Sequence, residues 1–78
     1  MSRSSFTAAF TEAFGRPPMT YLREARMRRA ADLLRSTDEP VERIASRVGD
    51  ASRSRFSQAF AVQFGASPSD FRHQPPAA

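Results

Sequence analysis

Three side chains close together in the second half of the chain could pair with the edges of nucleic-acid bases: Ser54, Arg55 and Gln58. Glutamine can form two hydrogen bonds with adenine, arginine can form two with guanine, and a serine hydroxyl can pair with several base edges. If this segment is a helix, with about 100° per residue, Ser54 and Gln58 lie nearly opposite Phe56 and are flanked by Arg55. Such an outer face, with hydrogen-bonding residues and no acid, is suited to the major groove of double-stranded DNA.

Two residues at the start of the same segment could contact the phosphate backbone instead. Arg53 lies nearer the apolar side of the helix, so we expect it to contact a phosphate, and Ser52 could hold another together with the free backbone amides of the first turn. All twelve cationic residues are arginine, and the net charge is +4. Arginine binds phosphate through a planar fork, and a basic balance favours a polyanionic partner. A coding bias toward arginine explains the absence of lysine equally well.

The composition gives little support to other kinds of site. The chain has no cysteine and a single histidine, His73, so we expect no metal site, no cofactor and no catalytic triad. Glu39 and Glu42 are expected near the start of a helix, where the helix dipole favours acids. No apolar run approaches the ~20 residues that span a bilayer, and no apolar stretch of a secretory signal follows Met1. We therefore expect a cytoplasmic protein that is not an enzyme and does not associate with membranes.

An internal repeat indicates which elements position the candidate side chains. Six of the seven phenylalanines occur in two frames that lie fifty residues apart, each with a spacing of four residues and each followed by glycine. The frames are Phe6, Phe10, Phe14 and Gly15, and Phe56, Phe60, Phe64 and Gly65. Because a spacing of four places the rings on one face of a helix, the repeat predicts two equivalent helices with aromatic and polar faces on opposite sides.

The spacing of apolar residues is helical throughout, and 78 residues allow one domain. We expect an all-α domain over residues 1–73 and a disordered tail over residues 74–78. Its helical segments are expected at residues 1–15, 18–36, 40–64 (two helices around a turn) and 67–72. Asp38 or Glu39 is expected to cap the helix that has Pro40 in its first turn.

Residues 40–64 have the pattern of a helix-turn-helix. The first helix has an apolar stripe at helical spacing, formed by Val41, Ile44, Ala45 and Val48. The small alanine of this stripe lies where the two helices would cross, Gly49 allows the turn, and the second helix would pack inward through Phe56, Ala59 and Phe60. The same motif also occurs in many helical proteins that do not bind DNA.

Two stretches of the chain resemble the C-terminal DNA-binding region of AraC/XylS-type transcription regulators: PPMTYLREARMRRAADLLRSTDEPVERIASRVG and SRSRFSQAFAVQFGASPSDFR. The resemblance covers residues 1–72. It implies a homeodomain-like fold of two helix-turn-helix units joined by a long linker helix, with one recognition helix of each unit in successive major grooves. Here the second unit is complete and the first is reduced to its recognition helix. A linker over residues 18–36 would separate the two recognition helices on the scale of one DNA turn, ~34 Å.

The resemblance also assigns DNA contacts to individual residues. In the second recognition helix they are Ser54, Arg55 and Gln58, and in the first they are Ser4, Thr7 and Ala8, with Arg3 near the DNA backbone. The methyl group of Ala8 can touch only a thymine methyl or nothing, so a solvated surface position is the favoured interpretation for this residue. The resemblance further implies contact with RNA polymerase, for which the sequence assigns no residue.

Two departures from the family pattern leave a second function open. Family members have about two more helices before the first recognition helix, so Met1 is an internal methionine, the start of a truncated domain, or the start of a chain that pairs with another. The aromatic face of α-helical residues Phe6, Phe10 and Phe14 would then lack cover, and large exposed apolar patches usually mark interfaces. The alternative is a truncated fragment for protein interaction or self-association, with weak or no DNA binding. Asp50, where the family usually has an aromatic residue, could also repel a phosphate.

Overall fold

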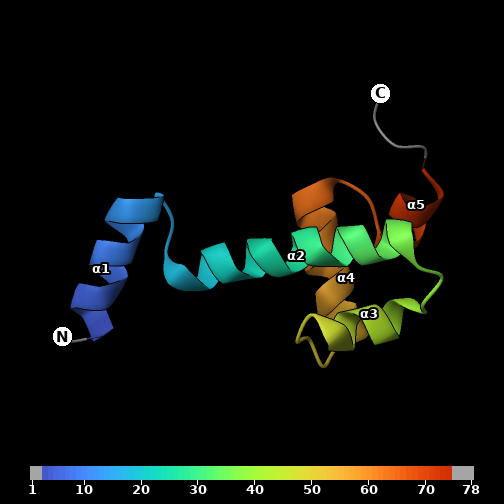
Figure 1. The fold of residues 1–78 in the computed structure, drawn as a ribbon, viewed down its shortest axis with the longest axis horizontal. Helices are drawn as coiled ribbons and strands as arrows, with labels where there is room; N and C mark the ends of the chain where they lie inside the picture. Colours follow the sequence, from blue (N-terminus) through green and yellow to red (C-terminus); the bar gives the residue numbers. More distant parts are fainter. Residues whose placement is uncertain (1–2, 75–78) are drawn as a thin grey trace.

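The computed structural model describes residues 3–74, which form helices joined by short turns (Figure 1). In chain order the helices are α1 (Arg3–Phe14), α2 (Pro18–Ser36), α3 (Val41–Arg47), α4 (Arg53–Phe64) and α5 (Pro68–His73). No strand occurs in this part of the chain, so the predicted all-α class is confirmed. The predicted disordered tail lies, apart from residue 74, outside the described residues.

The long helix α2 connects the two aromatic helices. It has 19 residues, which at ~1.5 Å per residue gives a length of about 28 Å. α1 lies at the start of α2, whereas α3, α4 and α5 gather around its second half (Figure 1). α1 and α4 are therefore held at different points along one continuous helix.

Proline and glycine set several helix ends. Pro18 occupies the first position of α2, where its missing N–H would have no partner within the helix anyway. α4 ends at Gly65, whose φ of 76° is left-handed and whose N–H donates to the carbonyl of Ala61. The stop at Gly65 that the sequence predicted is confirmed.

The predicted cap of α3 is wrong. Pro40 itself occupies the N-cap position, with φ −59° and ψ 148°, and neither Asp38 nor Glu39 caps the helix. The helix cannot extend back to Glu39 because a residue before proline avoids the helical region. Glu39 instead pairs with Arg47 at the other end of α3, and its N–H donates to the Thr37 hydroxyl at 3.3 Å.

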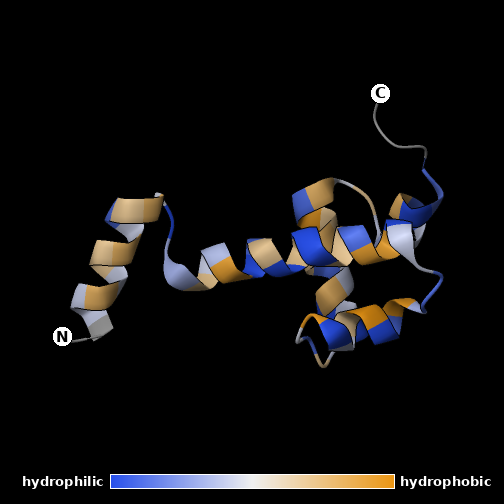
Figure 2. Cartoon of the chain, viewed as in Figure 1, coloured by the Kyte–Doolittle hydropathy of each residue, from blue (hydrophilic) through white to orange (hydrophobic). Residues whose placement is uncertain are grey.

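The hydrophobic core lies where α3, α4 and α5 meet the second half of α2. α3 contributes its whole predicted stripe: Val41, Ile44, Ala45 and Val48 are all buried. Figure 2 shows the hydrophobic side of α3 turned toward α2 and α4. α4 contributes Phe56 and Phe60, and α5 contributes Phe71. The buried residues of α2 are Met27, Ala30, Ala31 and Leu34.

The phenylalanine rings of α1 are spaced like those of α4, but they are much less buried. The ring centroids of Phe6 and Phe10 are 6.0 Å apart, and those of Phe56 and Phe60 are 5.9 Å apart. Phe56 is 0% exposed, whereas Phe6 is 52% exposed. The difference arises because α1 lies against the start of α2, away from α3 and the second half of α2 (Figure 1). Tyr21 packs against the Phe10 ring at 5.6 Å between centroids and joins α1 to α2.

Candidate nucleic-acid interface

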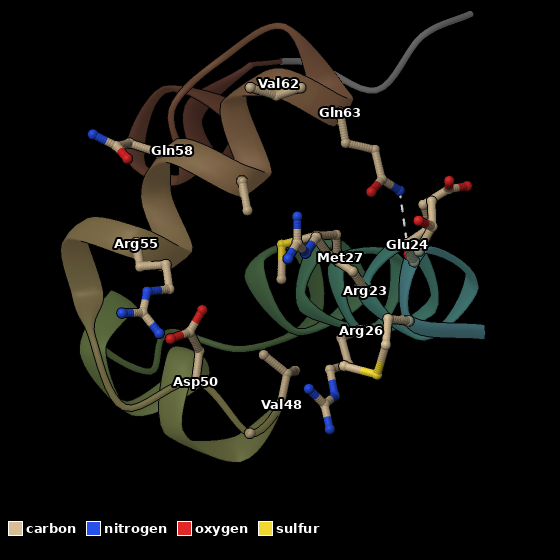
Figure 3. Close-up of a pocket in the computed structure, with 14 residues that line it drawn as sticks. Arg23, Glu24, Arg26, Met27, Val48, Asp50, Arg55, Gln58, Val62 and Gln63 are labelled. Carbon is tan, nitrogen blue, oxygen red and sulfur yellow. Dashed lines mark hydrogen bonds between the residues drawn. The ribbon is translucent and has the colours of Figure 1, made fainter. Parts of the chain in front are cut away.

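The outer face of α4 carries the three side chains that the sequence predicted to pair with bases. Ser54, Arg55 and Gln58 are exposed, while Phe56 and Phe60 on the other side of the helix are fully buried. Figure 3 shows Arg55 and Gln58 on neighbouring turns of α4. The buried rings therefore determine which side chains α4 presents to a ligand, as their spacing predicted.

The turn before α4 is closed by two backbone hydrogen bonds. The N–H of Gly49 donates to the carbonyl of Ser46 at 3.0 Å, and the N–H of Asp50 donates to the carbonyl of Ala45 at 2.8 Å. This pair of hydrogen bonds is typical of a helix that ends with a residue of left-handed backbone conformation just beyond it. Here that residue is Gly49, whose φ is 90°. The turn thus fixes the direction in which the chain enters α4.

Ser52 caps α4, as predicted. Its hydroxyl oxygen accepts a hydrogen bond from the N–H of Arg55 at 3.2 Å, which satisfies one free donor of the first turn. Because the hydroxyl acts as an acceptor here, its own hydrogen can still be donated to a phosphate. The N–H of Ser52 in turn donates to the Asp50 carboxylate at 3.2 Å. Asp50, which the sequence presented only as a departure, thus helps to hold the start of α4.

The two arginines of the first turn of α4 differ in their partners. Nη1 of Arg53 lies 3.6 Å from a carboxylate oxygen of Glu42, and both side chains are exposed. An exposed pair of this kind contributes little free energy, so Arg53 can exchange Glu42 for a phosphate at small cost. The guanidinium of Arg55 forms no ion pair with any residue among 3–74.

Two of the three predicted base-contacting residues of α1 also lie away from its rings. Ser4 and Ala8 are exposed and Thr7 is half-buried. By helical phase Ser4 and Ala8 lie nearly opposite Phe6, whereas Thr7 lies at the edge of the aromatic stripe, about 20° from Phe14. Arg3 is the first residue of the helix. α4 therefore presents all three of its predicted reading residues away from its rings, whereas α1 does so for Ser4 and Ala8 but not for Thr7.

Sequence reasoning missed a hollow of about 630 Å³ between α2, the α3–α4 turn and α4 (Figure 3). Arg55 and Gln58 line its α4 side, and Arg23 and Arg26 line its α2 side. The spacing of three residues indicates that Arg23 and Arg26 share a face of α2. Nothing in the spacing indicates that this face is the one turned toward α4, since that depends on how Phe56 and Phe60 pack.

Among residues 3–74, no group of histidine, aspartate and glutamate side chains is arranged to hold a metal ion. None of the helices in this range combines the length and the apolar character that crossing a membrane would require.

Comparison with known proteins gives consistent matches along the chain. A family described as a helix-turn-helix domain matches residues 1–74. Among curated proteins, the HTH-type transcriptional regulator AlkR of Acinetobacter baylyi is 40% identical over 74 residues, which are 95% of this chain and 24% of that protein. The regulatory protein SoxS of Escherichia coli is 43% identical over 54 residues, 69% of this chain and 50% of SoxS.

Two solved structures have nearly the same fold. The C-terminal domain of AraT, a response regulator from Geobacillus stearothermophilus, superimposes with a TM-score of 0.93 at 32% identity, covering 100% of this chain and 64% of that one. The DNA-binding domain of AdpA, a global transcriptional factor crystallised in complex with a target DNA, gives a TM-score of 0.89 at 33% identity, covering 92% of this chain and 65% of that one. The chain thus spans about a quarter to a half of the curated relatives named above.

Proposed function

This chain belongs to the AraC-type family of helix-turn-helix transcription regulators, and on that basis we propose that it is a sequence-specific module for binding double-stranded DNA. The observation that carries the proposal is the exposed polar face of α4, which buried Phe56 and Phe60 hold outward. The likeness to a DNA-binding domain that was crystallised with its target supports it. Binding DNA in the cytoplasm without catalysis would then be its role in transcription regulation.

In this proposal the contacts divide into those that position the protein and those that read sequence. Ser52 and Arg53 on α4 and Arg3 on α1 contact phosphates. The base contacts come from Ser54, Arg55 and Gln58 on α4 and from Ser4, Thr7 and Ala8 on α1. With α2 about 28 Å long, the two helices enter successive major grooves on one side of the duplex, whose turn is ~34 Å. Contact with RNA polymerase stays a prediction.

The assignment of the reading face can be tested with Arg55→Ala and Gln58→Ala on a duplex selected for binding. We expect each variant to lose roughly 1–3 kcal/mol of binding free energy and to relax the preference at one base pair. Arg28→Ala, which removes an exposed arginine of α2 outside the hollow, is the matched control and should keep the preference. Unchanged sequence preference in both test variants would overturn the assignment.

A second candidate function is self-association through the aromatic face of α1. It is favoured by the exposure of Phe6 and Phe14, which are 52% and 56% exposed. Sedimentation of the chain separates the two candidates. A monomer with a cooperative melt and specific DNA binding supports the first, and a dimer that Phe6→Ser disrupts supports the second.

A further inference from the structure

We propose that the hollow between α2 and α4 holds a stretch of DNA phosphate backbone, gripped by Arg23 and Arg26 of the linker helix. The inference rests on the proposed function and adds a binding site to it. It would make α2 a direct contact to the DNA strand that passes between the two reading helices, in addition to being their spacer.

The position of the hollow along α2 is the first argument. On α2 it is lined by residues between Met19 and Met27, which lie in the first half of the helix. α1 lies at the start of α2 and α4 crosses the second half (Figure 1), so this stretch lies between the two reading helices. Arg55 and Gln58 belong both to the outer face of α4 and to the wall of the hollow. A duplex read by α4 therefore continues directly into it.

The charge of the lining is the second argument. Three arginines face two acids there: Arg23, Arg26 and Arg55 against Glu24 and Asp50. The carboxylate of Glu24 pairs with Arg16, and that of Asp50 accepts from the N–H of Ser52. Within residues 3–74 none of the three lining arginines is in an ion pair. Unpaired guanidinium groups that line the same hollow are suited to the oxygens of a phosphate chain.

The walls of the hollow are also fixed relative to each other. Nε2 of Gln63 on α4 donates to the backbone carbonyl of Glu24 on α2 at 3.2 Å. Buried Met27 and Val48 lie beneath the arginines. These contacts hold α2, the α3–α4 turn and α4 together. A DNA strand bound to α4 therefore meets the α2 wall of the hollow at a defined distance.

The placement of the two arginines agrees with this role. A Cβ atom built on Gly49 would lie 3.5 Å from Cζ of Arg26, so the Arg26 guanidinium packs against the helix-turn-helix turn. Arg23 extends from α2 toward the middle of the hollow in Figure 3. The two guanidinium groups thus lie at different points of the hollow, Arg23 toward its middle and Arg26 against the turn, where a strand leaving α4 could contact both.

The test compares two double variants of equal charge. Arg23→Gln with Arg26→Gln removes the proposed grip, and Arg28→Gln with Arg29→Gln removes two exposed arginines of the same helix that do not line the hollow. The probe is a fluorescent duplex selected for binding to the unaltered chain, together with a duplex of random sequence. Affinities are measured by anisotropy between 50 and 200 mM salt, and circular-dichroism melts report folding.

Each phosphate contact contributes about 0.9 to the slope of log affinity against log salt. We expect the first pair to reduce the steepness by about 2, so that the unaltered chain loses about tenfold more affinity than this variant over the salt range. The weakening should be the same on both duplexes, and the second pair should keep nearly the original slope. Replacing the phosphates between the two half-sites by neutral methylphosphonates should weaken the unaltered chain but not the first pair.

The outcomes distinguish failure of the proposed phosphate site from failure of the proposed function. If the variant with Arg23→Gln and Arg26→Gln is folded and keeps the original salt slope, the phosphate site at these arginines is wrong, while DNA binding by α4 stands. The same holds if both double variants reduce the slope equally. If the unaltered chain shows no preference for the selected duplex over the random one, the proposed function fails and the inference fails with it.

Discussion

Asp50, in the turn between α3 and α4, has a side chain that would support folding and oppose the binding of DNA. The Asp50 carboxylate accepts a hydrogen bond from the N–H of Ser52 and so supports the start of α4. The same carboxylate lies in the hollow with Arg23, Arg26 and Arg55, where its charge would repel a phosphate. Its hydrogen bond and its charge therefore act in opposite directions on DNA affinity.

Asp50→Asn separates these two effects, because the amide oxygen of asparagine can still accept from Ser52. Two unit charges at 4 Å in water interact by roughly 1 kcal/mol, so we expect affinity for the selected duplex to rise severalfold with little change in melting temperature. Anisotropy titration measures the first and circular dichroism the second. Asp32→Asn, an equal charge change at an exposed site outside the hollow, should have a smaller effect. Weaker binding by Asp50→Asn at unchanged stability would contradict this account.

Two serine caps in the chain, Ser52 of α4 and Ser67 of α5, have equivalent geometry. The hydroxyl of Ser52 accepts from Arg55 N–H, and that of Ser67 accepts from Asp70 N–H, both at 3.2 Å. Loss of such a cap costs roughly 0.5–2 kcal/mol, so Ser52→Ala and Ser67→Ala should lower the free energy of unfolding similarly. Only Ser52→Ala should also weaken DNA binding, since α5 lies away from the proposed interface. Equal losses of affinity in both variants would instead indicate a general effect of stability.

At the scale of elements, the repeat offers a matched comparison. Phe56 and Phe6 occupy equivalent positions, yet one is 0% and the other 52% exposed. Phe56→Ala should cost about 3–5 kcal/mol in the free energy of unfolding, as expected for a buried phenylalanine, whereas Phe6→Ala should cost much less. Urea denaturation followed by circular dichroism measures both. Similar costs would show that α1 is covered in solution, for example by a second copy of the chain.

The helical elements could be predicted because their signals are local. Apolar residues at helical spacing predicted the buried stripe of α3, and Ser52 and Gly65 predicted how α4 begins and ends. The cap of α3 was missed because two acids before Pro40 look like caps, while the proline itself takes that position. The exposed face of α4 was predictable from the phase of its rings.

The features that could not be predicted depend on contacts between distant segments. Tyr21 and Leu22 continue the apolar pattern of α2, yet they are 39% and 41% exposed because α3, α4 and α5 gather around the other half of the helix. Arg72 donates to the carbonyl oxygens of Leu34 and Thr37 and so ties α5 to the end of α2. Neither of these arrangements nor the hollow at Arg23 leaves a spacing signal in the chain.

At the scale of the whole molecule, the distance between α1 and α4 is set by one continuous helix. α1 is joined to α2 by the ring of Tyr21, whose centroid lies 5.6 Å from that of Phe10 and 5.5 Å from that of Phe14. Arg16, in the turn between the two helices, also pairs with Glu24 of α2. α4 is fixed to the second half of α2 by the core. The protein should therefore read two half-sites at one spacing only.

This rigidity can be tested by inserting base pairs between the half-sites of the selected duplex. Five base pairs turn the second half-site to the far side of the DNA, and ten restore its side but move it about 34 Å further away. Because α2 cannot lengthen, we expect both insertions to reduce affinity to the same residual level, at least tenfold below the original duplex, since several base contacts of roughly 1–3 kcal/mol each are lost. A duplex of original spacing with altered intervening sequence is the control. Recovery at ten base pairs but not at five would mean that α1 and α4 are connected flexibly, and equal binding to all duplexes would mean that α4 alone reads the DNA.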